Sequence, residues 1–314
     1  MKTIKYTLLG LLGIFCLILF WGLLEPYLID TKQEIAEIPN LPAAWEGERV
    51  AVIADWQIGM WMDNTNTIDR IVEQLIEERP AVVLIAGDFI YHPGEDPSEV
   101  INKAVEFARS LPAAGIPTYA VLGNHDYAMK SKQGTPNTEL ARQLHEALEA
   151  VGVEVLQNEA VAIGNPALRA IPPSENGNPT AANRADNTPL YLVGIGAHWP
   201  NNDQPKVAVN LVPEGTPRLV MMHNPDSFEA LPPNTAPLAV AGHTHGGQIR
   251  LPFTSEWSWL TFSKEDEVHA DGWIPEYGQS GNRLYVNRGI GFSILPMRIN
   301  CPPEVTVFTL RSSV

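Results

Sequence analysis

The chain has 314 residues, of which 45% are hydrophobic, enough to form one large or two small globular domains. Its 36 acidic and 21 basic residues give a formal net charge of -15, which argues against nucleic acid as a partner, because sequence-independent binding needs a cationic surface. The two cysteines, Cys16 and Cys301, are too few for a thiolate zinc site, so any metal ion must be held by His, carboxylate or amide groups.

The N-terminal segment is predicted to be an uncleaved membrane anchor. Residues Thr7–Leu24 carry no charge, and the run lies near the lower length limit of about 17 residues for a membrane-spanning helix. Lys2 and Lys5 precede the run and acidic residues follow it, so the positive-inside rule predicts a single-pass protein of the inner (plasma) membrane whose catalytic domain lies on the periplasmic or extracellular side. A cleaved signal peptide is the alternative, but no small-residue cleavage site follows the run.

The rest of the chain alternates apolar, β-branched runs with helical patterns. This alternation predicts a layered α/β fold with a largely parallel or mixed sheet. The expected strands are Arg49–Ala54, Ala81–Ala86, Thr118–Leu122, Val153–Leu156, Tyr191–Ile195, Arg218–Met222, Leu238–Ala241, Arg283–Val286 and Glu304–Leu310. The expected helices are Thr65–Arg79, one that begins at Asp96–Ser98, and Asn137–Val151. The predicted organisation is an anchor at 1–30, a polar linker at 31–47 and a folded domain at 48–314.

Two long segments interrupt this pattern. Residues 165–189 are rich in Pro, Asn and Ala and are predicted to be a surface excursion. Residues 250–280 have no clear period, and such a stretch in a compact domain is more often a functional loop than filler. The apolar residues of this second segment either contact an amphiphilic substrate or pack as a core or lid: Trp257, Trp259, Leu260 and Phe262.

Polar side chains follow five of the expected strands at the point where each strand ends. Ligands of α/β sheets bind at the carboxyl ends of strands, so these side chains are expected to share one site. The five strand ends carry Asp55-Trp56-Gln57, Gly87-Asp88, Gly123-Asn124-His125-Asp126, His223-Asn224 and Gly242-His243-Thr244-His245-Gly246-Gly247.

These residue types suit metal-assisted hydrolysis of a phosphate ester. Imidazole, carboxylate and carboxamide oxygen are ligands for Zn, Fe and Mn, and two ions about 3.5–4 Å apart can activate water and neutralise phosphoryl oxygens. Taken singly, Gly87-Asp88 is typical of a turn and His223-Asn224 of a helix cap. Two histidines between glycines, at 243 and 245, fit metal binding better than core packing. His198 also follows a strand and could approach the same pocket.

The ordered set of motifs resembles the calcineurin-like metallophosphoesterase family, and the GHTHGGQ run at 242–248 resembles its membrane-anchored bacterial branch. The resemblance implies a four-layer α/β/β/α sandwich and a binuclear centre of two divalent ions, Mn, Fe, Zn or Mg. The implied first ion is held by Asp55, Gln57, Asp88 and His245, and the second by Asp88 as a bridge with Asn124, His223 and His243. The resemblance also implies a metal-bridging hydroxide that attacks phosphorus, with His125 as the general acid and Asp126 polarising it.

One position departs from the family, which usually has His where this chain has Gln57. A carboxamide oxygen is a neutral ligand, weaker than imidazole but competent for a hard ion. Family branches that cleave nucleotide diphosphates also carry Gln here, so we expect a shift of metal preference toward Mn or Mg. The alternative is a catalytically weak, membrane-tethered module that binds metal and phosphate.

The expected substrate is a phosphomonoester, phosphodiester or pyrophosphate, carried by a small molecule or by a lipid. An anchor beside the membrane favours an amphiphilic phosphate. The resembling branch includes enzymes that act on acylated sugar-nucleotide pyrophosphates. Those substrates are cytoplasmic, whereas the charge pattern around the anchor predicts a catalytic domain outside the cytoplasm.

Overall fold

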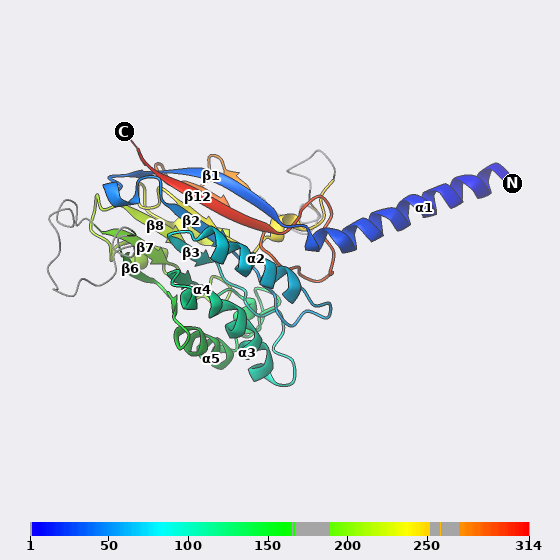
Figure 1. The fold of residues 1–314 in the computed structure, drawn as a ribbon, viewed down its shortest axis with the longest axis horizontal. Helices are drawn as coiled ribbons and strands as arrows, with labels where there is room; N and C mark the ends of the chain where they lie inside the picture. The colour runs from blue at the N-terminus through cyan, green and yellow to red at the C-terminus, as the bar shows by residue number, and fades with distance from the viewer. Residues whose placement is uncertain (1, 165, 167–188, 252–257, 259–269, 314) are drawn as a thin grey trace.

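The computed structural model describes residues 2–164, 166, 189–251, 258 and 270–313. They form two six-stranded sheets that pack face to face, with helices on the outer face of each sheet (Figure 1). The predicted four-layer α/β/β/α sandwich is therefore confirmed. Nearly all of the predicted surface excursion at 165–189 and most of the loop at 250–280 lie outside the described residues, as do Trp257, Trp259, Leu260 and Phe262.

The first sheet places the N-terminal and C-terminal strands of the fold side by side. Its strands, in spatial order, are β1 (Asp30–Pro39), β12 (Glu304–Ser313), β2 (Arg49–Ile53), β3 (Val82–Ile85), β4 (Thr118–Ala120) and β5 (Val153–Val155). Neighbours run parallel except for β12 and β2. Its outer face is covered by α2 (Thr65–Glu78), α3 (Pro97–Ala108), α4 (Ser110–Ala113) and α5 (Thr138–Glu149), which Figure 1 shows together on one side of the sandwich.

The second sheet has a thinner outer layer. Its strands, in spatial order, are β10 (Gly272–Ile274), β11 (Leu284–Val286), β9 (Ala239–Ala241), β8 (Arg218–Met221), β7 (Leu190–Gly194) and β6 (Glu159–Ile163). The four central strands are parallel, and β10 and β6 are antiparallel edge strands. Among the described helices, the short helix α6 (Pro205–Val209) and the 3-10 helix η6 (Pro225–Ala230) supply apolar side chains to the cluster on its outer face, and loop residues such as Val212 and Ala236 complete it.

Side-chain alternation along the strands explains the layers. In β2, Val50 and Val52 face the second sheet, whereas Ala51 and Ile53 face the helices. All four are fully buried, which is why the sequence of a central strand reads as a continuous apolar run. The fold thus buries one core between the sheets and one beneath each helical layer.

The predicted linker at 31–47 is wrong, because its first part forms strand β1, which pairs in parallel with β12 over its whole length. Only Ala36 and Ile38 of this strand are buried. Its other side chains are mostly polar and lie at the edge of the sheet, where charged residues discourage pairing with another chain. An edge strand with so few buried positions has the composition of a linker. The other strands that the sequence did not predict are the edge strands β6 and β10.

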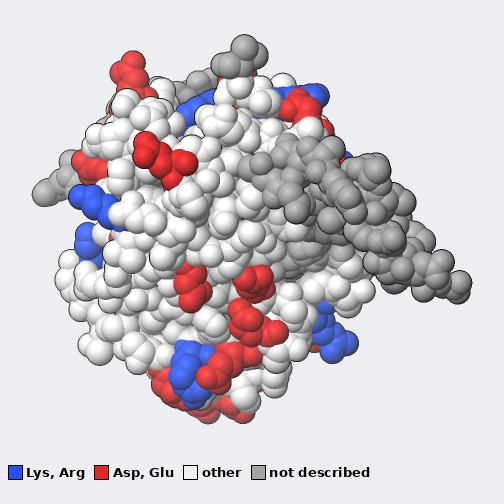
Figure 2. All heavy atoms as spheres, turned by 90° about the vertical axis from the view of Figure 1, so that its left-hand side faces the viewer, with Lys and Arg blue, Asp and Glu red and all other residues white. Residues whose placement is uncertain are grey.

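The N-terminal helix leaves the sandwich at the end where the carboxyl ends of the central strands lie. Helix α1 (Lys2–Leu24) is long and apolar enough to cross a membrane, and it projects away from the domain (Figure 1). The short helix η1 (Glu25–Tyr27) leads from α1 to β1, which is parallel to β12 and therefore antiparallel to β2. The carboxyl end of β2 consequently lies beside α1. At the opposite end, charged side chains of both signs are scattered over a largely uncharged face (Figure 2).

Candidate metal centre

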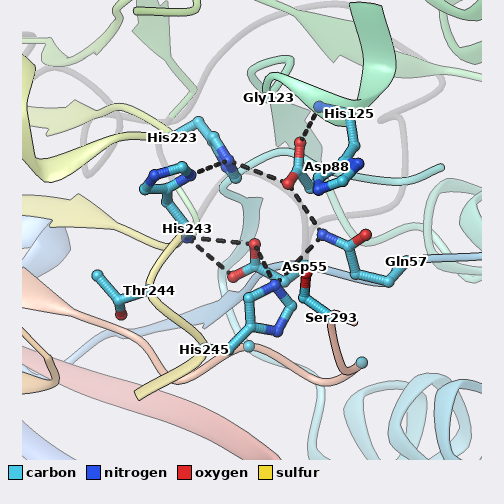
Figure 3. A network of polar contacts seen from close by, with 12 residues as sticks. Asp55, Gln57, Asp88, Gly123, His125, His223, His243, Thr244, His245 and Ser293 are labelled. Carbon is cyan, nitrogen blue, oxygen red and sulfur yellow. Dashed lines mark hydrogen bonds and ion pairs between the residues drawn. The ribbon is translucent and has the colours of Figure 1, made fainter. Parts of the chain in front are cut away.

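Five of the predicted site residues adopt a backbone conformation that is rare for side chains with a Cβ. Their φ angles are positive: +52° for Asp55, +54° for Gln57, +56° for Asp88, +73° for His243 and +50° for His245. Each such residue costs on the order of 1–3 kcal/mol and persists only where the surroundings enforce it. The chain thus bends sharply just after strands β2, β3 and β9, which turns these five side chains toward one another (Figure 3).

Asp88 stands at the centre of the cluster and is fully enclosed. Its Oδ1 accepts the backbone N–H of His125 at 2.8 Å. Its Oδ2 accepts from Gln57 Nε2 at 2.9 Å and lies 3.2 Å from His223 Nε2. Gly123 is required for this approach, because a Cβ there would collide with the Asp88 carboxylate. One carboxylate therefore reaches both sides of the cluster.

On one side of Asp88, three donors are fixed by contacts to the backbone or to each other. His223 Nδ1 lies 2.8 Å from the carbonyl oxygen of Ala86, which keeps a proton on Nδ1 and directs Nε2 into the cluster, where a metal ion would displace the proton that Nε2 holds. The Asn124 amide donates to the carbonyl oxygen of Met129, which points Asn124 Oδ1 to within 3.2 Å of His223 Nε2. His243 Nδ1 lies 3.3 Å from the same Nε2. Ligand atoms of Asp88, His223 and His243 all lie within 4.8 Å of one another.

On the other side, the donors are buried but less completely bonded. The Asp55 carboxylate accepts the backbone N–H of His243 at 3.0 Å and lies 3.6 Å from His245 Nε2. Gln57 Nε2 is 3.3 Å from the same His245 nitrogen. Gln57 Oε1 and His245 Nδ1 are buried and have no hydrogen-bond partner among the described residues. Amide oxygen and nitrogen exchange places by a simple rotation, so Gln57 can present either atom to Asp88 and His245.

The electrostatics of the cluster suit a cation. Burial raises the pKa of Asp55 to about 7, even though the charge of His223 opposes that rise. Burial would also raise the pKa of Asp88, but His223 and His125 outweigh it and lower that pKa. The carboxylates Asp88 and Asp55 in turn raise the pKa of His223 to about 9 against the effect of burial. Two buried carboxyl groups thus depend on one imidazolium for compensation.

His245 behaves differently, because burial and the nearby guanidinium of Arg298 lower its pKa to about 3. Its imidazole is therefore neutral at physiological pH, which is the form that binds metal. The donor set as a whole fits divalent ions: carboxylate, neutral imidazole and carboxamide oxygen converge, and two buried polar atoms await a partner. All seven predicted ligand positions belong to this one contact network.

The predicted catalytic pair, His125 and Asp126, does not interact as expected. His125 Nδ1 lies 3.1 Å from the carbonyl oxygen of Tyr91, and the two rings stack with centroids 4.9 Å apart. Asp126 is fully buried and accepts three backbone N–H groups, those of Asp88, Gly123 and Ile90. The expected polarisation of His125 by Asp126 is therefore corrected: a backbone carbonyl orients the imidazole, and Asp126 holds the loops that carry Asp88 and Asn124.

A pocket of about 550 Å³ opens over the cluster and contains residues that the sequence analysis did not single out. Tyr91 and Trp199 are aromatic walls, and the Trp199 ring lies 5.0 Å from the His243 ring, edge to face. Lys130 and Lys132 line the mouth, so this acidic chain places two cations at its pocket. Both lysines closely follow residues 123–126 in the sequence, and this proximity to a predicted ligand motif could have indicated that they lie near the site.

His198 is not among the residues that line this pocket. Its Nδ1 lies 2.7 Å from Asp203 Oδ2, and Asp203 also accepts from Ser227 Oγ at 2.7 Å. His198 therefore does not approach the pocket as expected, whereas its neighbour Trp199 lines it.

Comparisons with known proteins agree with this geometry. The family model described as calcineurin-like phosphoesterase matches residues 48–247. The phosphodiesterase YaeI of Escherichia coli K12 is 30% identical over 239 residues, which are 75% of this chain and 72% of the relative. The uncharacterized metallophosphoesterase YkuE of Bacillus subtilis is 24% identical and covers 92% of this chain and 88% of its own. The UDP-2,3-diacylglucosamine pyrophosphatase LpxG of Chlamydia muridarum is 27% identical, with 90% of each chain covered.

Proposed function

Because the chain belongs to the calcineurin-like phosphoesterase family and is thus a metal-dependent phosphoester hydrolase, we propose that it uses two divalent ions held in the cluster around Asp88. The observation that carries this proposal is the convergence of seven donor side chains from separate strand ends, six of them gathered around the buried carboxylate of Asp88. The first ion would be held by Asp55, Gln57, Asp88 and His245. The second would be held by Asp88, Asn124, His223 and His243. Bound there, the ions would supply an activated water and neutralise phosphoryl oxygens.

The protein's own part in the reaction is to position the phosphate and deliver a proton. Lys130 and Lys132 attract an anionic substrate to a chain whose net charge would otherwise repel it. His125 lines the pocket beside Asp88 and is the candidate general acid for the leaving oxygen. Burial lowers the pKa of His125, so its protonated form depends on negative charge nearby, which Asp88 and a bound phosphate supply.

The bond that the enzyme cleaves is a phosphodiester, a phosphomonoester or a pyrophosphate. One relative is named a phosphodiesterase and another a pyrophosphatase. Both names describe cleavage of a phosphorus–oxygen bond, in an ester in the first case and in an anhydride in the second. We place α1 in the inner (plasma) membrane, with the catalytic domain on the outer side, from the lysines at positions 2 and 5. A C-terminal reporter active only in the cytoplasm would give a signal if this orientation were wrong.

The proposal is tested with the full chain in detergent, because Gly22, Glu25 and Pro26 are buried against the domain and belong in the preparation. The protein is stripped of metal and assayed on p-nitrophenyl phosphate and bis-p-nitrophenyl phosphate, with Mn, Fe, Zn or Mg restored separately. We expect cleavage that returns only with metal, and the ratio of the two rates assigns the bond type.

A pair of histidine variants controls for general damage. His223→Ala, within the cluster, should abolish the restored cleavage, whereas His145→Ala, on α5, should leave it intact. A folded, metal-loaded protein that cleaves neither ester would contradict the proposal and favour a module that only binds metal and phosphate.

A further inference from the structure

The membrane helix is joined to the loop that borders the pocket. Gly22 lies within the uncharged part of α1, and its carbonyl oxygen accepts the backbone N–H of Arg298 at 2.9 Å. A Cβ at Gly22 would lie 3.1 Å from Ile299 and 3.2 Å from Met297, so the helix and the loop are in direct contact there. If α1 spans a membrane, residues 297–299 must lie at its surface.

The buried carboxylate of Glu25 fixes this junction. It accepts the indole N–H of Trp21 at 2.6 Å and the backbone N–H groups of Asn300 and Cys301. Arg298, which is fully buried, donates to the carbonyl oxygens of Gly289 and Cys301. The helix therefore cannot swing freely about the domain, and the orientation of the pocket relative to the membrane is set by the fold.

The other end of the same loop reaches the pocket. Ser293 and Ile294 line the cavity over the metal cluster, and the backbone N–H of Ser293 donates to Gln248 Oε1 at 2.7 Å. Gln248 also donates to the carbonyl oxygen of Leu295 and lines the pocket itself. Only a few residues separate the wall of the pocket from the residues that touch α1. The mouth of the pocket consequently opens close to the surface from which α1 emerges.

This border of the pocket carries exposed apolar side chains. Ile294 is 58% exposed and Leu295 is 47% exposed. Leu251 is 57% exposed and sits beside the same loop, since its carbonyl oxygen accepts from the Asn300 side chain. Leu28, just after η1, is 48% exposed. Exposed apolar side chains gathered at the foot of an apolar helix are typical of a surface that contacts lipid.

We propose that this apolar rim, Leu28, Leu251, Ile294 and Leu295, rests in the headgroup layer of the bilayer that holds α1, so that the metal site takes its phosphate from a lipid of that membrane. The proposal rests on the proposed function and narrows its substrate class to amphiphilic phosphate esters. Ile294 joins the two surfaces, since it is both a wall of the pocket and part of the rim. Lys130 and Lys132 then face a phosphate presented at the mouth, and the acyl chains stay in the bilayer.

The first experiment measures the depth of the rim and needs no substrate. The full chain with Cys16→Ser is reconstituted into vesicles of phosphatidylethanolamine and phosphatidylglycerol, and an environment-sensitive dye is attached at Leu295→Cys. Cys301 is buried and stays unlabelled. The matched control is Leu211→Cys, which is at least as exposed, at 56%, but lies at the far end of the sandwich. Its place there follows from Arg218, at the start of β8, which donates to the carbonyl oxygens of Val209 and Pro213 on either side of Leu211.

We expect nitroxide-bearing lipids to quench the dye at position 295, with a blue shift of its emission, and to leave the dye at 211 unchanged. An unquenched dye at 295 overturns the proposal, whatever the enzyme cleaves.

The second experiment compares two phosphodiesters with the same leaving group, the soluble bis-p-nitrophenyl phosphate and a diacylglycerol p-nitrophenyl phosphate in the vesicles. The double variant Leu251→Glu and Leu295→Glu should slow cleavage of the lipid about tenfold, because the charges oppose insertion of the rim, and should leave the soluble ester unchanged. Leu211→Glu should change neither rate.

The outcomes separate this inference from the proposed function. Cleavage of the soluble ester without cleavage of the lipid, or lipid cleavage that the double variant leaves unchanged, overturns the membrane rim alone. A wild-type protein that cleaves neither ester overturns the proposed function, and the dye at 295 still reports whether the rim meets the bilayer.

Discussion

The two halves of the candidate metal centre differ in how completely the protein has arranged them. Around His223, a backbone carbonyl orients the imidazole, and the Met129 carbonyl orients the amide of Asn124. Around Asp55, the amide oxygen of Gln57 and one nitrogen of His245 are buried without a partner among the described residues. The first half is ready to bind an ion without rearrangement, whereas the second must be completed by the ion.

This difference indicates which half of the centre binds its ion more tightly and which half sets the metal preference. Hydrogen bonds from the outer shell fix ligand geometry and typically change metal affinity 10–100-fold when they are removed, so the half around His223 should bind its ion more tightly. The half that contains Gln57 is the one in which this chain departs from the usual family residue. We expect it to determine which metal is used and how easily the enzyme is inactivated by chelators.

The largest effect should come from the residue that both halves share. Asp88→Asn removes the negative charge that would bind both ions. It should raise the activation free energy by several kcal/mol and so lower kcat/KM roughly a thousandfold or more. Steady-state kinetics with saturating metal measures this loss. Asp203→Asn, a partly buried acidic residue outside the pocket, is the matched control and should stay within a few fold of wild type. Wild-type turnover in Asp88→Asn would end the shared-carboxylate account.

His125→Ala tests proton delivery separately from metal binding. For a substrate with a poor leaving group, such as an alkyl phosphodiester, kcat should fall about 10²–10⁴-fold. The fall should be much smaller for a p-nitrophenyl ester, whose leaving group needs no proton. Metal content, measured in the same sample, should not change. An equal loss for both esters would argue that His125 binds or positions the phosphate and donates no proton.

The smallest effect should come from Gln57→His, which restores the usual family residue. An imidazole in place of the amide should tighten zinc binding in the half around Asp55 by about tenfold or more, because imidazole is a stronger zinc ligand than a carboxamide oxygen. Competition with a fluorescent chelator measures both affinities, and the affinity of the half around His223 should be unchanged. Loss of zinc binding on this substitution would mean that Gln57 is not a ligand position.

Much of the fold was predictable from the sequence because its central strands are buried on both faces. The runs at 49–54, 81–86 and 218–222 gave β2, β3 and β8 within about one residue, and the amphipathic pattern at 65–79 gave α2. Strand β1 could not be predicted, since only two of its side chains are buried and its pairing with β12 joins the two ends of the chain. Its strand state is imposed by tertiary contact.

The residues of the centre were predictable, but their partners were not. Motifs at strand ends gave all seven converging donors, because parallel strands bring their carboxyl ends together. The bond between His125 and the Tyr91 carbonyl oxygen was not predictable, because it depends on a loop conformation. Nor were the positive φ angles of Asp55 and Gln57, which no local sequence signal announces. The role of Asp126 as a backbone acceptor was missed for the same reason.

Anomalous X-ray diffraction from crystals of the full chain loaded with manganese tests the two-ion centre most directly. The account predicts two peaks of anomalous density, one beside Asp55, Gln57 and His245, the other beside Asn124, His223 and His243, with Asp88 between them. It also predicts that Gln57→Ala weakens only the first peak. A single peak, or density away from Asp88, would contradict the binuclear centre.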